Sequence, residues 1–340
     1  MKKIIGLLAA MALSAGYEQV SAQGLHFSQY YNAPMLMNPA NTALMSENDY
    51  RIGVNYRQQW ATIPVPYTTM SAFADFQAFR SEALQNNWLG IGLAFFNDKA
   101  GDGDLSLSQV QLSLAYHIQL GEISMVSVGL YGGYDQRSIN FNNLTFDSQW
   151  DGFKFDKNLA NKEQDNLAKT NFTDFGAGIN YAYFPNESVY IKFGAGVAHV
   201  NQPKESFYNF ENKIGIRPIA NVDGLFMLNE TFTLNPSVYY SYQKDAMELL
   251  YGTLLDVYVA GSKENSTDLI FGAFHRWNEA LVGAFGVRYG SLKIMCSYDY
   301  TVSKLATENR GNGALEFSLI YMGKYGKFGH APMNTNCPRF

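Results

Sequence analysis

The sequence predicts an all-β protein, namely a transmembrane antiparallel β-barrel of the outer-membrane type with about fourteen strands. Apolar residues alternate with polar or small residues along many segments, which places the two kinds of side chain on opposite faces of a strand. The composition joins 47% hydrophobic and 15% aromatic residues to only 16% charged residues. A lipid-facing outer wall and a polar lumen explain both observations. A secreted β-sandwich is the alternative, but its wetted faces usually carry more charge.

The amino terminus has the features of a signal peptide, which we place at residues 1–22. Two lysines precede the apolar run Ile4–Ala15, and the small residues Val20-Ser21-Ala22 suit a cleavage site. This apolar run is shorter than the roughly 20 residues of a membrane-spanning helix, and no longer apolar run follows it. We therefore expect an exported protein of the bacterial outer membrane, which crosses that membrane with strands rather than helices.

The barrel is predicted to occupy residues 48–324. The segment 104–120 shows the clearest alternation, with valine, leucine and tyrosine set against glutamine, serine and histidine. Inward glycines and alanines are expected to let the strands curve and tilt. The predicted strands lie near 48–60, 67–80, 87–98, 104–120, 122–138, 171–184, 187–201, 212–228, 230–243, 246–260, 267–277, 280–290, 292–303 and 312–324.

The connections predict which end of the barrel faces the periplasm. Tight turns fall at one end, namely 121–122, 185–186, 229–230 and 290–291. Longer connections fall at the other end, namely 139–170, 202–211 and 304–311. Short periplasmic turns and long outer loops are the usual arrangement in bacterial barrels.

Nothing in the sequence supports an enzyme, and we expect neither a cofactor nor a metal site. The histidines are scattered and lack the spacing of a metal site or a catalytic triad. The acidic turn Asp98–Asp104 is better explained by glycine turn geometry than by bound calcium. A net charge of −5 without a dense basic patch argues against nucleic acid as a partner. Cys296 lies in the apolar set of its strand, and we expect it to remain unpaired.

Charged and polar residues at inward positions of the first and last strands predict a cluster in the lumen. Closure pairs the first strand with the last, which makes these side chains neighbours. Charges beside a low-dielectric wall must be paired or hydrated. The cluster is either a salt-bridge network that fixes closure or a contact surface for something inserted in the lumen. Its predicted members are Arg51, Asn55, Arg57, Arg288, Asp299 and Glu316.

The stretch HFSQYYNAPMLMNPANTAL (26–44) contains no Asp, Glu, Lys or Arg, and prolines interrupt it. Proline blocks helix and sheet ladder alike, and the lack of charge permits burial. We expect residues 23–47 to form an ordered segment at the periplasmic mouth, which partly closes a lumen too wide for side chains alone to fill. A disordered linker is the alternative, but linkers seldom carry so many aromatic residues. The contact residues predicted in this segment are Phe27, Tyr30, Tyr31, Pro34, Asn38 and Pro39.

Several motifs point to a known family, namely FSQYYNAPMLMNPANTAL (27–44), NDKAGDGD (97–104), CSYDYTVSKL (296–305) and the terminal CPRF (337–340). Together they resemble the PorP/SprF family of type IX secretion system membrane proteins of the Bacteroidetes. The resemblance implies a non-enzymatic outer-membrane barrel. Such barrels help to export or to anchor large proteins that carry a type IX C-terminal domain, among them gliding adhesins. It also implies contacts with other type IX components on the periplasmic side.

The loop 139–170 is the longest candidate for contact with a partner outside the cell. Its aromatic residues are interleaved with acidic ones, as at protein interfaces, namely Phe146, Trp150, Phe153 and Phe155. Folding of this loop over its own barrel mouth is the alternative. The tail 325–340 is expected in the periplasm, either as a docking peptide or as a plain extension. Two functions stay open, a partner barrel of type IX secretion and an outer-membrane channel for small or hydrophobic solutes.

Overall fold

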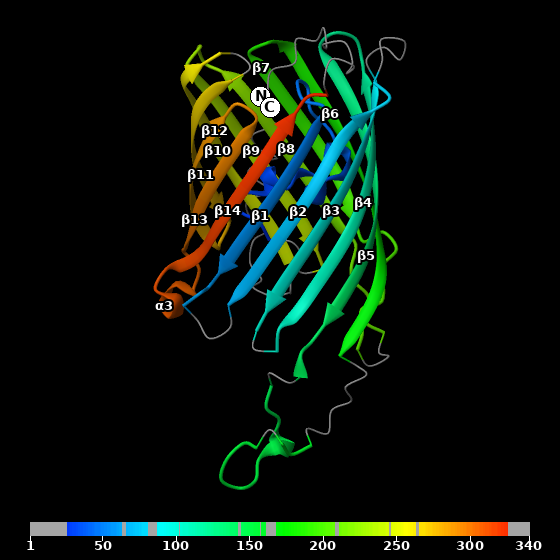
Figure 1. Cartoon of the computed structure of the whole chain (residues 1–340), viewed down its shortest axis with the longest axis vertical. Helices are drawn as coiled ribbons and strands as arrows, with labels where there is room; N and C mark the ends of the chain where they lie inside the picture. The colour runs from blue at the N-terminus through cyan, green and yellow to red at the C-terminus, as the bar shows by residue number, and fades with distance from the viewer. Residues whose placement is uncertain are drawn as a thin grey trace, which may run out of the picture.

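The computed structural model describes residues 26–325, with the exception of 63–65, 81–86, 102, 142–143, 157, 161–167, 208–210, 245 and 263–264. The predicted signal peptide and most of the predicted tail, with Cys337, lie outside the described residues. The described residues form one closed antiparallel barrel of fourteen strands, in which β1 pairs with β14 (Figure 1). The predicted fold class is confirmed.

The strands follow one another around the barrel in sequence order. Their bounds are β1 Tyr50–Gln59, β2 Tyr67–Ala78, β3 Trp88–Ala100, β4 Leu105–Gln119, β5 Ser124–Ser138, β6 Lys169–Asn186, β7 Val189–Ala198, β8 Arg217–Met227, β9 Phe232–Gln243, β10 Ala246–Gly261, β11 Ser266–Arg276, β12 Ala280–Tyr289, β13 Leu292–Thr301 and β14 Asn312–Gly323. Each predicted strand corresponds to one of these. The start of β8 differs most, because a bridge between Lys204 and Lys213 closes the preceding residues into a loop of their own.

Burial alternates along the strands as the sequence pattern predicts. On β4, Leu112 is 53% exposed on the outer wall, whereas Gln111 and Ser113 face the lumen and are almost fully buried. Hydrocarbon around the barrel would cover such outward apolar side chains. Cys296 on β13 is a free cysteine, as far as the described residues go.

The two ends of the barrel differ in their connections (Figure 1). One end holds the start of β1, the end of β14 and short hairpins such as 187–188 and 290–291. At the opposite end, the β5–β6 connection contains η5 (Asp147–Gln149) and projects away from the barrel, and α3 (Ala306–Asn309) lies between β13 and β14. We call these the short-turn end and the long-loop end. In the usual arrangement the short-turn end faces the periplasm.

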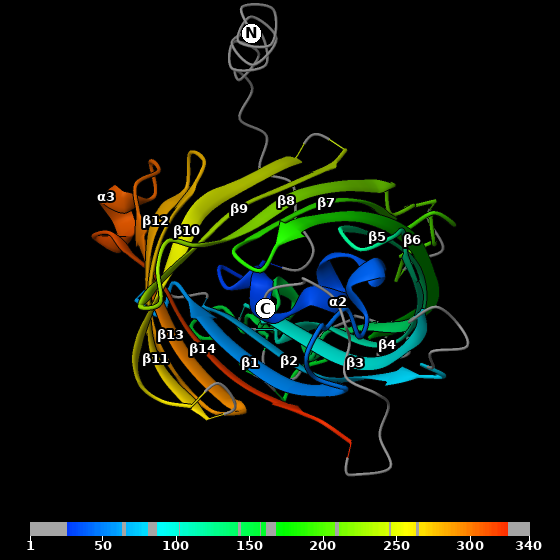
Figure 2. The ribbon, with the colours of Figure 1, turned by 90° about the horizontal axis from the view of Figure 1, so that it is seen from above.

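Residues 26–46 lie inside the barrel, and we call them the plug (Figure 2). The plug contains three short helices, η1 (Tyr30–Asn32), α2 (Pro34–Met37) and η2 (Pro39–Asn41). Pro34 and Pro39 begin α2 and η2, where a missing N–H group leaves no helical hydrogen bond unmade. The side chain of Asn38 accepts a hydrogen bond from the Ala40 N–H at 2.9 Å and so caps η2.

The sequence predicted that this segment lies at the periplasmic mouth. In the structure, the plug runs through the whole lumen, from the long-loop end to the short-turn end. Its first residue, His26, contacts the β11–β12 turn at the long-loop end. Near its other end, Ala43 contacts Trp88, the first residue of β3, at the short-turn end. Within the described ranges, no helix is long and apolar enough to cross a membrane.

Candidate functional site

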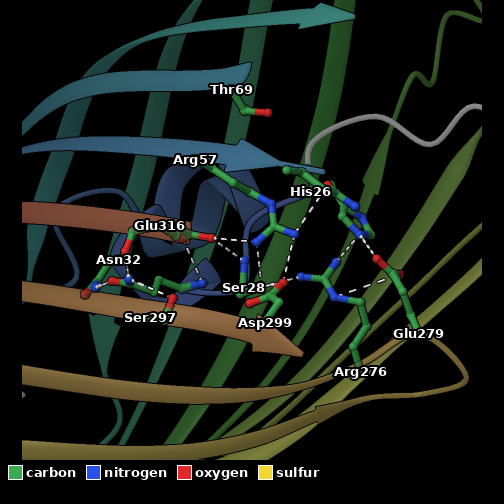
Figure 3. A network of polar contacts seen from close by, with 12 residues as sticks. His26, Ser28, Asn32, Arg57, Thr69, Arg276, Glu279, Ser297, Asp299 and Glu316 are labelled. Atoms are coloured by element: carbon green, nitrogen blue, oxygen red, sulfur yellow. Dashed lines mark hydrogen bonds and ion pairs between the residues drawn. The ribbon is translucent and has the colours of Figure 1, made fainter. Parts of the chain in front are cut away.

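The lumen wall holds the first residues of the plug through buried charges near the long-loop end (Figure 3). Glu316 on β14 accepts hydrogen bonds from the backbone N–H groups of Ser28 and Gln29, at 2.8 and 2.9 Å. Arg57 on β1 lies 3.1 Å from Glu316 and 2.9 Å from Asp299 on β13. All three charged side chains are almost completely buried. The structure thus brings together three of the predicted lumen residues, and they contact the plug.

A second group of charges beside this one surrounds His26. Its Nε2 lies 2.9 Å from Glu279 in the β11–β12 turn, and its Nδ1 lies 3.3 Å from Glu248 on β10. Arg276 on β11 contacts Nε2 of His26 and binds Glu248 at 2.8 Å. Arg276 also donates to the hydroxyl of Ser28 at 2.7 Å, which joins the two groups. Burial acts to raise the pKa of Glu279, but the charges of His26 and Arg276 outweigh it and hold this pKa well below its ordinary value.

The plug completes the solvation of these buried charges. Removing a charge from water costs several kcal/mol unless neighbouring groups replace the lost hydration. The hydroxyl of Ser28 donates to Asp299 at 2.7 Å and accepts from Arg57 at 2.8 Å. Together with the two backbone N–H groups that face Glu316, it takes the place of water. A plug without Asp, Glu, Lys or Arg and a charged wall are therefore complementary.

In the middle of the barrel the plug backbone lies directly against glycines of the wall. A Cβ atom at Gly129 on β5 would lie 2.5 Å from the carbonyl oxygen of Pro39, and one at Gly178 on β6 would collide with the side chain of Asn38. Only glycine leaves this space. These inward glycines make room for the plug, a reason that differs from the strand curvature expected from the sequence. Asn38 also donates to the side chain of Asn180 at 3.1 Å.

At the short-turn end the wall holds the plug through its backbone. The carboxylate of Asp75 on β2 accepts a hydrogen bond from the Ala43 N–H at 2.7 Å. The indole N–H of Trp88 donates to the Ala43 carbonyl at 3.0 Å, and Nε2 of His117 on β4 lies 2.8 Å from the Thr42 carbonyl. Sequence reasoning did not select Asp75, Trp88 or His117. All three occupy inward positions of strands with alternating polarity, and this pattern could have predicted that their side chains face the lumen.

Aromatic side chains of the plug pack against strands β9 and β11 of the wall. Tyr30 lies against Tyr239 on β9 with ring centroids 5.3 Å apart, and Tyr31 stacks on Phe274 on β11 at 5.5 Å. Such pairs contribute about 0.5–1.5 kcal/mol each beyond the area that they bury. All predicted contact residues of this segment belong to the plug, namely Phe27, Tyr30, Tyr31, Pro34, Asn38 and Pro39.

Two further predicted residues hold the plug at other heights. Arg51 on β1 binds Asp75 at 2.6 Å, next to the hydrogen bond between Asp75 and the plug. Asn55, also on β1, donates to the plug carbonyl of Asn32 at 3.3 Å. Both therefore lie in the lumen near the plug but outside the Arg57 network.

Arg288 is not a neighbour of the first strand, which corrects the predicted cluster. Its strand, β12, is separated from β1 by β13 and β14. Arg288 instead pairs with Asp256 on β10 at 2.9 Å and with Asp268 on β11 at 3.1 Å. These residues lie toward the short-turn end of their strands, whereas Arg57 lies toward the long-loop end.

The aromatic residues predicted in the outer loop lie on a projection beyond the barrel (Figure 1). Trp150 and Phe155 form an isolated antiparallel bridge, with ring centroids 5.0 Å apart. Between them, the side chain of Asp151 accepts hydrogen bonds from two backbone N–H groups, both at 2.8 Å, which orders the turn. Phe153 in this turn is 93% exposed. Phe146 lies at the base, just before η5. The described part of the loop thus points away from the barrel mouth rather than over it.

The acidic turn between β3 and β4 uses its carboxylates in local contacts. Asp98 accepts a hydrogen bond from Thr69 at 2.6 Å, and Asp104 lies 3.4 Å from Lys99. In the part of the chain that the structure describes, no group of three or more histidine, cysteine or acidic residues could hold a metal ion.

Comparison with solved structures finds the same fold in two toluene transporters. The toluene transporter TbuX of Ralstonia pickettii matches with a TM-score of 0.51 at 11% identity, over 86% of this chain and 94% of that chain. The toluene transporter TodX of Pseudomonas putida matches with a TM-score of 0.50 at 10% identity, over the same shares, 86% and 94%. At such low identities the likeness shows the fold alone.

Comparison by sequence identifies the family. No protein of curated function matches the chain. The model of one family, described as type IX secretion system membrane protein PorP/SprF, matches residues 19–321. This match covers most of the chain and includes the plug and almost the whole barrel. The chain therefore belongs to the PorP/SprF family of type IX secretion system membrane proteins, as its motifs predicted.

Proposed function

We propose that this protein is an outer-membrane partner barrel of the type IX secretion system. It supports the export or surface anchoring of large proteins that carry a type IX C-terminal domain, and it is not an enzyme. Membership of the PorP/SprF family supports a place in this secretion system. The proposed partners are such a secreted protein at the long-loop end and other type IX components at the periplasmic end.

The plug is the observation that carries this proposal. It contacts the wall at both ends and in the middle, and most of its residues are buried. A solute channel, the alternative, needs a path that is open or opens easily. A barrel filled by its own chain is better suited to bind a partner at its rims. Because hydrocarbon transporters share this fold, a solute channel is the alternative function that the experiment must test.

The outer projection supplies a surface for a partner. Trp150, Phe153 and Phe155 are 49%, 93% and 49% exposed, and the ordered turn fixes them in place. Rigid aromatic side chains lose little conformational freedom on binding, and they are enriched where partners bind most tightly. The acidic residues around them favour a partner whose binding cleft is apolar with a basic rim.

Copurification from cells that produce the tagged chain tests the proposal. We expect the wild-type chain to recover a protein with a type IX C-terminal domain. The double variant Trp150→Ser, Phe153→Ser should recover about tenfold less or lower, because loss of two anchors costs more than about 1.4 kcal/mol. Tyr289→Ser is the matched control, since Tyr289 is 70% exposed at the short-turn end. Recovery of no such protein, together with solute-dependent conductance in planar bilayers, would replace the proposal by the channel.

A further inference from the structure

Strand β6 extends beyond its neighbour β7 at the long-loop end of the barrel. β6 is 18 residues long, whereas β7 is only 10 residues long. β6 pairs with β5 from Tyr183 to Lys169, but its pairing with β7 stops at Ala177, opposite Val197. Within the described part of the chain, residues 169–174 of β6 therefore have a paired strand on one side only. We call these residues the open edge.

Three hydrogen bonds show which backbone groups of β6 point to the side of the missing strand. The Val200 N–H, just after β7, donates to the Phe175 carbonyl at 3.0 Å. The side chain of Asn201 accepts from the Phe175 N–H at 3.2 Å and donates to the Thr173 carbonyl at 2.7 Å. In an antiparallel sheet, the N–H and C=O of one residue point to the same side, and those of every second residue repeat this. The Thr173 N–H and both backbone groups of Asn171 therefore point to the unpaired side, and they have no hydrogen-bond partner among the described residues.

The open edge lies beyond the apolar band of the outer wall. The outward side chain of Phe175 is apolar and exposed, whereas the outward side chains of Thr173, Asn171 and Lys169 are polar and exposed. Unpaired backbone groups are not tolerated in hydrocarbon, and the polar side chains agree with a position in water. An exposed edge of this kind can pair with a strand of another chain.

We infer that the open edge of β6 binds an extended segment of the secreted partner by strand addition. The inference rests on the proposed function, which supplies this partner. An extended backbone presents N–H and C=O groups at the spacing of the free groups on β6. The open edge also leads directly into the β5–β6 connection, which carries Trp150 and Phe153 in the outer projection (Figure 1). The aromatic side chains select the partner, and the open edge adds backbone hydrogen bonds that depend little on its sequence.

A proline at the open edge tests the inference by copurification from cells that produce the tagged chain. Asn171→Pro removes an N–H from the unpaired side and places its ring there, but it leaves the pairing with β5 intact. Asn171→Ala is the matched control, because both variants lose the side-chain bond from Gln136 and only alanine keeps the N–H. We expect Asn171→Pro to recover about tenfold less of the secreted protein than Asn171→Ala. Heat-modifiable migration on gels shows that each variant is a folded barrel.

The outcomes separate this inference from the proposed function. Equal recovery by the two variants would overturn the inference and leave the proposed function standing. Recovery of no secreted protein by the wild-type chain would overturn the proposed function, and this inference with it. A dimer of this chain that Asn171→Pro abolishes would assign the open edge to a second copy and would also overturn the inference.

Residue-resolved hydrogen exchange gives a second measurement, which begins with the free barrel. We expect the N–H groups of Asn171 and Thr173 to exchange fast, and those of Phe172 and Asp174, which point to β5, to exchange slowly. In the complex, Asn171 and Thr173 should exchange slowly as well. Slow exchange of both in the free barrel, or fast exchange of both in the complex, would overturn the inference.

Discussion

Gly129→Ala is expected to loosen the plug while leaving its own strand intact. The new Cβ would lie 2.5 Å from the carbonyl oxygen of Pro39, whereas ordinary contact begins at 3.4 Å. Strand β5 is paired along its length on both sides, so it cannot move away. The backbone atoms Ala40 N and Pro39 C would lie closer still, at 2.4 Å, so the plug backbone must retreat by about 1 Å in a close-packed lumen. Overpacking of this kind costs about 1–3 kcal/mol, which shifts the balance between seated and displaced plug by roughly 5- to 150-fold.

Gly132→Ala on the same strand is the matched control. Gly132 lies on the outer wall, and its new Cβ would meet only an ordinary contact of 3.4 Å with Phe175. Planar-bilayer recordings measure the frequency of conducting openings, and urea titration in detergent micelles measures the free energy of unfolding. We expect Gly129→Ala to open more often and unfold more easily, and Gly132→Ala to match the wild type. Equal behaviour of the two variants would refute the reasoning that the inward glycines make room for the plug.

Three further predictions concern the ion pairs and the projection. Arg57→Met should lower the free energy of unfolding by about 3–5 kcal/mol in a urea titration, because it leaves buried carboxylates unpaired; an unchanged titration midpoint would contradict this. The pKa of Glu279 is lower in the folded protein than its ordinary value of 4.5. Ionised Glu279 therefore stabilises the fold fully at pH values above 4.5, and this stabilisation is lost as the pH falls below 4.5. Wild-type stability should therefore fall more steeply below pH 4.5 than that of Glu279→Gln, and superimposable pH profiles would rule the ion pairs out as the cause. Phe153→Ser should change the free energy of unfolding by less than about 0.5 kcal/mol, since its ring is 93% exposed; a larger loss would mean that the ring supports the fold.

Strand alternation and closure together predicted the contacts of Arg57 with Asp299 and Glu316. The period of two fixes which face of the sheet each side chain takes, and antiparallel closure makes β14 the neighbour of β1. Alternation does not give the height of a residue along a tilted strand. This is why Arg288, which has the right face, lies at the other end of the lumen and pairs with Asp256 and Asp268.

The wall residues that hold the plug were harder to predict, because the plug has no periodicity that sets its register against the strands. Its prolines and missing charges indicated burial, but they did not indicate a path. Arg276 and Glu248 were therefore not recognised as partners of His26, although both occupy inward positions. Inward Gly129 was interpreted through strand curvature for the same reason, since only the position of Pro39 shows why a side chain is excluded.

Wall carboxylates accept backbone hydrogen bonds at both ends of the plug, but only one end is also tied covalently to a strand, and we expect this difference to set the direction in which the lumen opens. At the short-turn end, Ala43 is held through backbone hydrogen bonds and the chain continues directly into β1, so covalent connection keeps it in place. At the long-loop end, Ser28 is held by charged groups that water or a partner's polar groups can satisfy instead. A partner shifts such an equilibrium only by its difference in affinity for the two states. We expect such a difference from a partner whose N–H or hydroxyl groups replace those of the plug as hydrogen-bond donors to Glu316 and Asp299 at the long-loop end. If a partner displaces the plug, we therefore expect displacement to begin at the long-loop end.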